Sequence, residues 1–126
     1  MRLHHVQVSC PRGGEDAARR FYGEGLGLSE VEKPVELQGR GGAWFRSSAP
    51  DGTVLAELHV GVEDGFTAAR KAHPAFALAD GAELDAVLGR LARLGFEIDR
   101  SEADTLPGYL RVHTRDGHGN RVELLA

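Results

Sequence analysis

The chain has 126 residues, of which 41% are apolar and 27% charged, so it has the length and composition of one water-soluble domain with a hydrophobic core. Its net charge is −4 and its basic residues are scattered, which excludes the electrostatic footprint of a nucleic-acid-binding protein, and no apolar run approaches the length of a membrane span. The single cysteine, Cys10, excludes an internal disulfide, and the N-terminal MRLHHVQV lacks the apolar segment of a signal peptide, so we expect a cytoplasmic protein.

A strand and a short helix are the first predicted elements. Residues 3–9 alternate in polarity, with His5 and the valines on opposite faces, which is the period of a strand. Pro11–Gly14 interrupts this pattern. Residues 15–28, EDAARRFYGEGLGL, then predict a helix with acidic residues in its first turn and glycines at its end.

The next predicted element is a β-hairpin over residues 41–60, GGAWFRSSAPDGTVLAELHV. The segment Ser48–Gly52 has the composition of its turn. In the second strand, apolar side chains recur at every other position. Glu57 and His59 therefore share the opposite face.

The same order of elements begins again after a glycine-rich, charged link. His73–Leu78 predicts a strand, and residues 80–98, DGAELDAVLGRLARLGFEI, predict an amphipathic helix. Asp80 suits the N-cap of this helix and Glu83 the third position of a capping box, while Gly95 ends it. The apolar stripe of the helix consists of Leu84, Val87, Leu88, Leu91 and Leu94.

The chain closes with a second predicted hairpin over residues 109–125, YLRVHTRDGHGNRVELL, which turns on its Asp-Gly and Gly-Asn pairs. The sequence thus contains an internal repeat of one order of elements: a strand, a helix, and strands that end in a hairpin. His5 and Glu57 lie in the first and last strands of the first unit. His73 and Glu123 lie in the corresponding strands of the second, at a similar separation. This repeat predicts an α+β fold of two modules related by a pseudo-twofold axis.

The histidines and carboxylates of these strands are candidate metal ligands. They lie opposite the apolar faces that pack against the helices, so they converge if the two sheets curve toward each other. Two imidazoles and one or two carboxylates in a cavity form a ligand set for a divalent ion such as Zn²⁺, Ni²⁺, Fe²⁺, Mn²⁺ or Co²⁺. A bound cation would also remove the cost of ionising a carboxylate there. The candidate ligands are His5, Glu57, His59, His73 and Glu123.

Four stretches of the sequence, LHHVQVS, FYGEGLGLSEV, KAHPAFAL and DGHGNRVELLA, resemble the vicinal oxygen chelate superfamily. This superfamily includes glyoxalase I, extradiol dioxygenases, fosfomycin-resistance enzymes and bleomycin-resistance proteins, and the resemblance covers essentially the whole chain. It implies a single glyoxalase-like domain, with βαβββ modules at residues 1–62 and 72–126, a link at 63–71, and curved mixed sheets around a cavity with the helices outside. It also implies a homodimer, with the site either within one chain or shared between chains.

The resemblance also implies specific ligands. In metal-dependent members of the family, ligands come from the first and last strands of each module, which correspond here to His5, His73 and Glu123. The fourth position matches Glu57 by analogy with Glu123. His59 departs from the family patterns, and it either replaces Glu57 as a ligand or acts as an acid or base beside the metal.

Further side chains are expected to line the cavity, because residues opposite each other in paired strands share a face. Arginines would hold an anionic group of a substrate there, and aromatic rings would cover an apolar one. The alternative interpretation is structural, with Trp44 as a core residue and His113 as an inert one. The substrate-binding candidates are Trp44, Arg46, Tyr109, Arg111 and His113.

The resemblance and the candidate site together predict a metal-dependent enzyme that acts on a small oxygen-rich or anionic molecule. The metal would chelate neighbouring substrate oxygens as a Lewis acid, while Glu57, His59 or Glu123 moves a proton. Lyase or isomerase chemistry is favoured because the chain has only two modules, whereas the common extradiol dioxygenases have four; Fe(II)-dependent extradiol chemistry is one alternative. The alternative from another class is a metal-free protein that sequesters a drug or metabolite in the same cavity.

Overall fold

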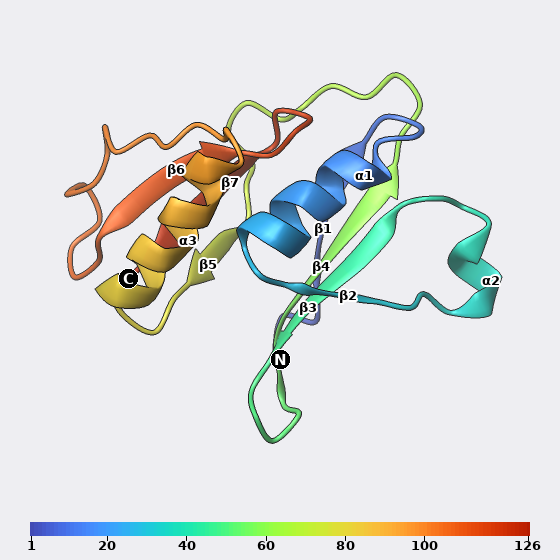
Figure 1. Cartoon of the computed structure of the whole chain (residues 1–126). Coiled ribbons are helices and arrows are strands. Elements are labelled where there is room, and N and C mark those ends of the chain that lie inside the picture. Colours follow the sequence, from blue (N-terminus) through green and yellow to red (C-terminus); the bar gives the residue numbers. More distant parts are fainter.

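The computed structural model describes all 126 residues, and its first half, module one, folds as a mixed sheet with helices on one side (Figure 1). The elements of module one are β1 (Val6–Cys10), α1 (Glu15–Ala18), the π-helix η1 (Arg19–Gly25), β2 (Ser29–Val31), α2 (Val35–Gln38), β3 (Ala43–Ser48) and β4 (Val54–Val62). The strand order is β1-β4-β3-β2. β1 runs parallel to β4, and the other neighbours are antiparallel.

The second half, module two, repeats this arrangement. Its elements are β5 (Ala75–Ala77), α3 (Gly81–Arg93), β6 (Arg111–Arg115) and β7 (Arg121–Leu125). The strand order is β5-β7-β6, with β5 parallel to β7 and β6 antiparallel to it. Asp99 pairs with His113 in an antiparallel bridge, in the place that β2 holds beside β3. The fold is therefore α+β with two βαβββ-type mixed sheets, as the internal repeat predicts.

One hydrophobic core joins the two modules. α1–η1 and α3 lie side by side on the same side of the two sheets (Figure 1), and α3 contacts η1 directly. Phe21 of η1, Leu91 of α3 and Phe45 of β3 are fully buried in the shared core. Each such side chain contributes roughly 1.5–3 kcal/mol when it leaves water. The helix layer is thus packed against one face of each sheet, which leaves the other face for polar side chains.

The predicted capping of α3 is confirmed. The Asp80 side chain accepts a hydrogen bond from the Glu83 backbone N–H at 2.9 Å, and the Glu83 carboxylate accepts one from the Ala79 N–H at 2.7 Å. The helix ends before Gly95, whose φ of 82° lies in the left-handed region that favours glycine. The buried residues of the helix are Leu84, Val87, Leu88 and Leu91.

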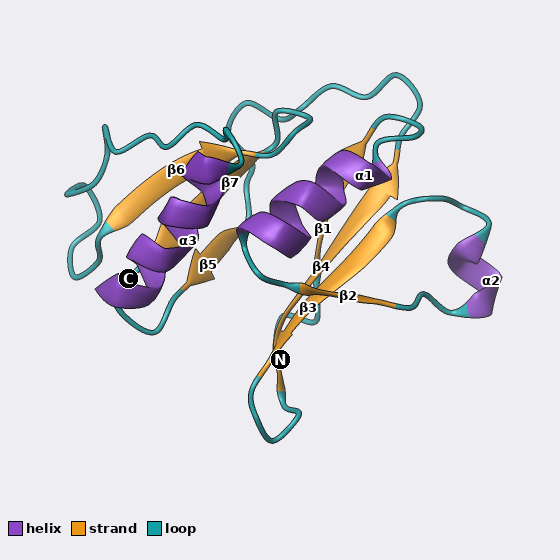
Figure 2. Cartoon of the chain, in the orientation of Figure 1, coloured by secondary structure: helices purple, strands orange, loops and turns teal.

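Some boundaries differ from the prediction. The strands predicted at residues 3–9 and 73–78 begin only at Val6 and Ala75. β2 and α2 have three and four residues, which is too short for a periodic pattern to show. Figure 2 shows the long loops that separate α3 from β6 and β4 from β5. None of the helices has the combination of length and apolar character that spanning a membrane requires.

Candidate metal centre

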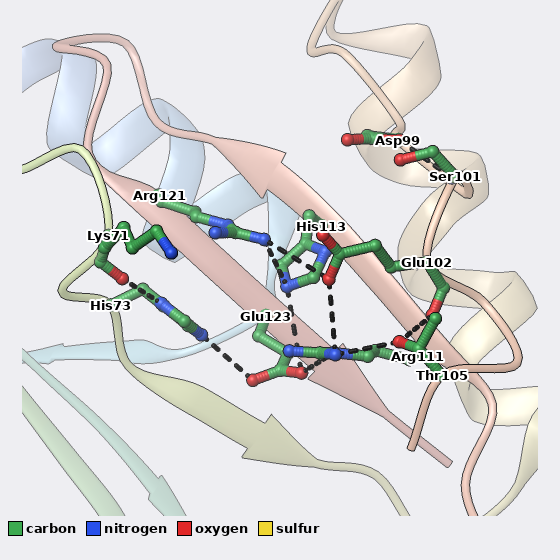
Figure 3. Close-up of polar contacts among 10 residues, drawn as sticks. All are labelled: Lys71, His73, Asp99, Ser101, Glu102, Thr105, Arg111, His113, Arg121 and Glu123. Carbon is green, nitrogen blue, oxygen red and sulfur yellow. Dashed lines mark hydrogen bonds and ion pairs between the residues drawn. The ribbon is translucent and has the colours of Figure 1, made fainter.

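The polar face of the module two sheet brings three potential ligands together (Figure 3). His73 lies two residues before β5, Glu123 lies in the middle of β7, and His113 of β6 is paired directly with Glu123. One potential ligand atom from each residue lies within 4.8 Å of the other two. Because side chains alternate along a strand, the neighbours of these residues in β6 and β7 pack into the core.

The hydrogen bonds of His73 determine which of its nitrogens is free. A carbonyl oxygen can only accept, so the contact of Nδ1 with the backbone carbonyl of Lys71 requires Nδ1 to donate. In the neutral ring, Nε2 then carries a lone pair. That nitrogen lies 3.1 Å from Oε2 of Glu123, which is also an acceptor. Two acceptors at this separation need a proton or a cation between them, and a metal ion bound by both would fill that role.

Glu123 is buried, with 6% of its surface exposed, and a guanidinium holds it in place. Arg111 donates from Nε to Oε1, which leaves Oε2 to face His73. Burial raises the pKa of Glu123, but the hydrogen bonds from Arg111 and His73 outweigh it, so the pKa lies below its usual value. Arg111 is itself held by Glu102 at 3.2 Å and by the Thr105 hydroxyl at 2.9 Å. The carboxylate is therefore ionised and oriented before any ligand arrives.

His113 joins this group as a third potential ligand, whereas the sequence predicts it as a substrate-binding residue. It is 3% exposed. Its Nε2 accepts a hydrogen bond from Arg121 at 3.0 Å and lies 3.7 Å from Oε1 of Glu123. Nδ1 then carries the proton, and it is buried without a hydrogen-bond partner. Burial lowers the pKa of His113, and the nearby charges of Arg121 and Arg111 lower it further, so the ring is neutral and has a lone pair to offer.

Three residues of module two that contact Arg111 or His113 are not predicted from the sequence. Glu102 and Thr105 lie in the irregular loop before β6, where no periodicity places them. Arg121 precedes Glu123 by two residues, so its place on the same face of β7 could have been read from the alternation. Tyr109, predicted to line the cavity, lies outside β6, is half exposed and makes no polar contact with this group.

The corresponding face of module one carries a second polar group, as the hairpin alternation predicts. Trp44 is paired with His59, and Arg46 with Glu57. The Glu57 carboxylate accepts from His59 Nε2 at 2.9 Å and from Arg46 Nε at 2.8 Å. The hydrogen bond from His59 lowers the pKa of Glu57; burial opposes this, and Arg46 lowers it further. Burial lowers the pKa of His59, with Glu57 acting in the opposite direction. His5 lies immediately before β1.

The rings of module one form a stack. Trp44 lies flat on His59 at 3.8 Å, with an angle of 1° between the ring planes, and His5 covers the other face of His59 at 4.1 Å. The ligand atoms of His5, Glu57 and His59 do not join those of His73 and Glu123, because the one group of three such residues within 4.8 Å is that of module two. The structure thus separates the predicted ligands into two groups, one on each sheet.

The strand register shows which positions correspond in the two modules. Two residues after His5, Gln7 pairs with His59, and two residues after His73, Ala75 pairs with Glu123. His59, rather than Glu57, therefore occupies the position equivalent to Glu123. By the same register Trp44 corresponds to His113, Arg46 to Arg115 and Glu57 to Arg121.

The donor set of module two suits a divalent ion. Two imidazole nitrogens and one carboxylate are ligands that Zn²⁺, Fe²⁺, Mn²⁺, Ni²⁺ and Co²⁺ all accept, and three protein ligands leave positions open for a substrate. The close approach of His73 Nε2 to Glu123 Oε2 and the position of His113 Nε2 beside the same carboxylate fit such a group. His73, His113 and Glu123 could therefore bind a divalent metal ion.

Comparisons with known proteins identify the family and agree with the fold. The family model described as Glyoxalase/Bleomycin resistance protein/Dioxygenase superfamily matches residues 2–124. A solved structure from Bacillus anthracis, whose description places it in the glyoxalase family, is 38% identical with a TM-score of 0.81, and the match covers 99% of this chain and 98% of that one. No curated protein matches the chain.

Two more distant structures share the fold. A glyoxalase/dioxygenase from Nostoc punctiforme is 23% identical with a TM-score of 0.72, and the match covers 98% of this chain and 89% of that one. The fosfomycin resistance protein FosX from Listeria monocytogenes is 16% identical with a TM-score of 0.71, with 98% and 88% covered. At these identities the similarity concerns the fold alone.

Proposed function

The chain belongs to the Glyoxalase/Bleomycin resistance protein/Dioxygenase superfamily, and on that premise we propose that it is a divalent-metal-dependent enzyme acting on a small oxygen-rich or anionic molecule. His73 and Glu123 are the two central ligands of this proposal, and His113 is the third within one chain. The reaction class that we favour is that of a lyase or isomerase, in which a proton is moved on a substrate with neighbouring oxygens.

One observation carries the proposal: Nε2 of His73 faces a carboxylate oxygen of Glu123 at 3.1 Å, and His113 offers a ligand atom beside the same pair. Each acceptor is oriented from behind, His73 by the Lys71 carbonyl and Glu123 by Arg111. Metal ligands are commonly oriented in this way, by hydrogen bonds to the atoms that do not face the ion.

The side chains around the site suggest how the reaction would proceed. A bound divalent ion would supply Lewis-acid polarisation of neighbouring substrate oxygens. Arg111 holds Glu123 ionised and oriented. A proton acceptor must then stand near the substrate, and our candidates for that role are Glu123 itself and the Glu57–His59 pair of module one.

His5 has a separate place in the proposal. It lies apart from His73 and Glu123 within the chain, so it could reach the ion only in a homodimer, from a second copy of the chain. A site shared between two chains would then use His5 as third ligand in place of His113.

Metal analysis of protein purified without an affinity tag tests the proposal. We expect stoichiometric uptake of Ni²⁺, Zn²⁺ or Fe²⁺ by the wild type and its loss in His73→Ala and Glu123→Ala. His59→Ala, at the equivalent position of module one, is the matched control and should keep the metal. His113→Ala and His5→Ala identify the third ligand. Turnover of the hemithioacetal of methylglyoxal and glutathione would support lyase or isomerase chemistry, and a coloured product from catechols would support dioxygenase chemistry.

The binding-protein alternative is favoured by a different observation. A groove of about 1000 Å³ between the modules is lined mostly by hydrophobic residues, including Leu3, Leu55 and Phe76. His73 and Glu123 are not part of its lining. Such a groove suits an apolar small molecule. A wild type that takes up none of the three metals would support this alternative and contradict the enzyme.

A further inference from the structure

Arg121 donates a hydrogen bond to the nitrogen of His113 that would bind the metal ion in the candidate centre. Its Nη2 donates to Nε2 of His113 at 3.0 Å, and the same atom lies 3.8 Å from Oε2 of Glu102 (Figure 3). Nε2 is also the nitrogen that faces Glu123, at 3.7 Å. The other nitrogen of His113, Nδ1, is buried and carries the proton of the neutral ring, so it has no lone pair to offer in its place.

A guanidinium and a metal ion compete for this position. The ring nitrogen has one lone pair, which accepts either a hydrogen bond or a metal ion. A divalent cation would also repel the guanidinium at such a short distance. Ligation by His113 therefore requires Arg121 to move away. Arg111 differs, because it binds Oε1 of Glu123 and leaves Oε2 free to face His73.

A cavity lies beside Arg121 and could receive it. Its volume is about 350 Å³, and both His73 and Arg121 form part of its wall. It lies between β1 and the link that joins the modules, and the polar side chains of Gln7, Ser9 and Thr67 line it without hydrogen-bond partners of their own. The cavity therefore lies next to the metal centre, with His73 in the wall between them. A guanidinium that turned into it would lie near these polar side chains, and both could bind the same ligand.

We propose that Arg121 is a displaceable guanidinium that caps His113 in the metal-free chain and, once a divalent ion binds, turns into this cavity to bind an anionic group of the substrate. The inference rests on the proposed metal site. A planar guanidinium forms paired hydrogen bonds with carboxylate and phosphoryl oxygens, and these are the two groups that fit. Glu63 is the one carboxylate in the cavity wall, so a ligand with a single anionic end is favoured over a polyanion.

The proposal predicts opposite effects of one substitution on metal and anion binding. In Arg121→Gln, Ni²⁺ should bind about tenfold more tightly, because a competing hydrogen bond and a repelling charge are removed. In the wild type, inorganic phosphate or acetate should raise the affinity for Ni²⁺ by roughly fivefold or more, since the two sites are coupled. That coupling should vanish in Arg121→Gln. The anion with the larger effect identifies the preferred group.

Competition with a chromophoric chelator measures the Ni²⁺ affinity directly, without any assay of activity. Arg115→Gln is the matched control, because Arg115 lies opposite Arg121 on β6 and its guanidinium binds only the Gly119 carbonyl. Arg121→Lys keeps the charge without the planar fork and should lie between the wild type and Arg121→Gln.

The outcomes separate the two proposals. A wild type and an Arg121→Gln variant that bind Ni²⁺ equally, with affinity lost in His73→Ala, would leave the metal site standing and overturn the role of Arg121. Phosphate and acetate without effect on the wild type would overturn the anion subsite. If neither protein binds Ni²⁺, the proposed function fails, and the inference fails with it.

Discussion

The polar faces of the two sheets hold equivalent positions and different chemistry. In module one, His59 donates to Glu57, and the faces of its ring are covered by Trp44 and His5. In module two, the equivalent position is Glu123, which lies between Nε2 of His73 and Nε2 of His113. The same backbone arrangement thus carries stacked and paired side chains on one face. On the other face it carries a group of potential metal ligands.

The two hairpin turns differ in the same way. Asp51, in the β3–β4 turn, accepts only the Thr53 backbone N–H and is exposed. Asp116, in the β6–β7 turn, is 5% exposed and accepts hydrogen bonds from the Tyr22 hydroxyl, the Asn120 side chain and two backbone N–H groups. Asn120 also donates to the Ser9 carbonyl of β1. The second turn therefore joins the two modules, whereas the first only reverses the chain.

The largest expected effect comes from removing this junction. Asp116→Ala should lower the free energy of unfolding by about 3 kcal/mol or more, because a buried carboxylate with four donors is lost and Tyr22 and Asn120 are left without their acceptor. Urea unfolding measures the change. Asp51→Ala, the same substitution in the equivalent turn, should have a far smaller effect. Equal losses in the two variants would show that the turns are not different after all.

The second prediction compares the arginines behind the two faces. Arg111→Gln should weaken Ni²⁺ binding roughly 10- to 100-fold, because Glu123 loses the donor that orients it. Arg46→Gln removes the arginine that holds a carboxylate on the polar face of module one, Glu57, and should leave the affinity unchanged. Chelator competition gives both values. A loss in Arg46→Gln as large as that in Arg111→Gln would mean that module one also contributes to the metal centre.

Local patterns in the sequence predict which side chains share the polar face of a strand. They do not predict the register in which two strands pair. Alternation placed Glu57 and His59 on one side of their strand because the period of two is local. Whether Glu57 or His59 matches Glu123 depends on how β4 pairs with β1, and a slip of two residues exchanges them. No local pattern determines that register.

The distance between His5 and His73 is a second case of this limit. The repeat predicts both residues in the first strands of their modules, and the structure places both just before those strands; their separation depends on how the two sheets pack. That packing is governed by contacts such as those of α3 with η1, between residues far apart in the chain. Module boundaries at 1–62 and 72–126 stay predictions. The capping of α3 was predictable because it involves only four consecutive residues.

The third prediction concerns pH, and it asks whether the buried histidines of the two faces behave alike. Burial lowers the pKa of both His59 and His113 below the ordinary 6.5, so the unfolded chain takes up protons at a pH where the folded chain does not. Stability should therefore fall as the pH drops below 6.5 toward the lowered pKa values. Glu57 and Glu123, whose pKa values are lowered from 4.5, add a further loss only at more acidic pH.

Urea unfolding from neutral pH down to about pH 5 checks this dependence. His59→Gln and His113→Gln should each flatten the slope. The fluorescence of Trp44, the one tryptophan of the chain, reports on His59 separately because its ring lies on the imidazole. A slope that both variants leave unchanged would show that neither histidine is kept neutral by the fold.

The smallest expected effect concerns the two helices. Asp80→Ala should cost about 1 kcal/mol in urea unfolding, because α3 loses the side-chain acceptor at its N-cap. α1 has Gly14 at its N-cap and no side-chain cap. Adding one should not help: a Cβ at Gly14 would lie 2.7 Å from the His118 ring, whose Nε2 donates to the Gly14 carbonyl. Gly14→Asp should therefore destabilise the protein. A higher free energy of unfolding in Gly14→Asp would contradict this explanation. It would show that the nearby β6–β7 turn leaves room for a side chain at this N-cap.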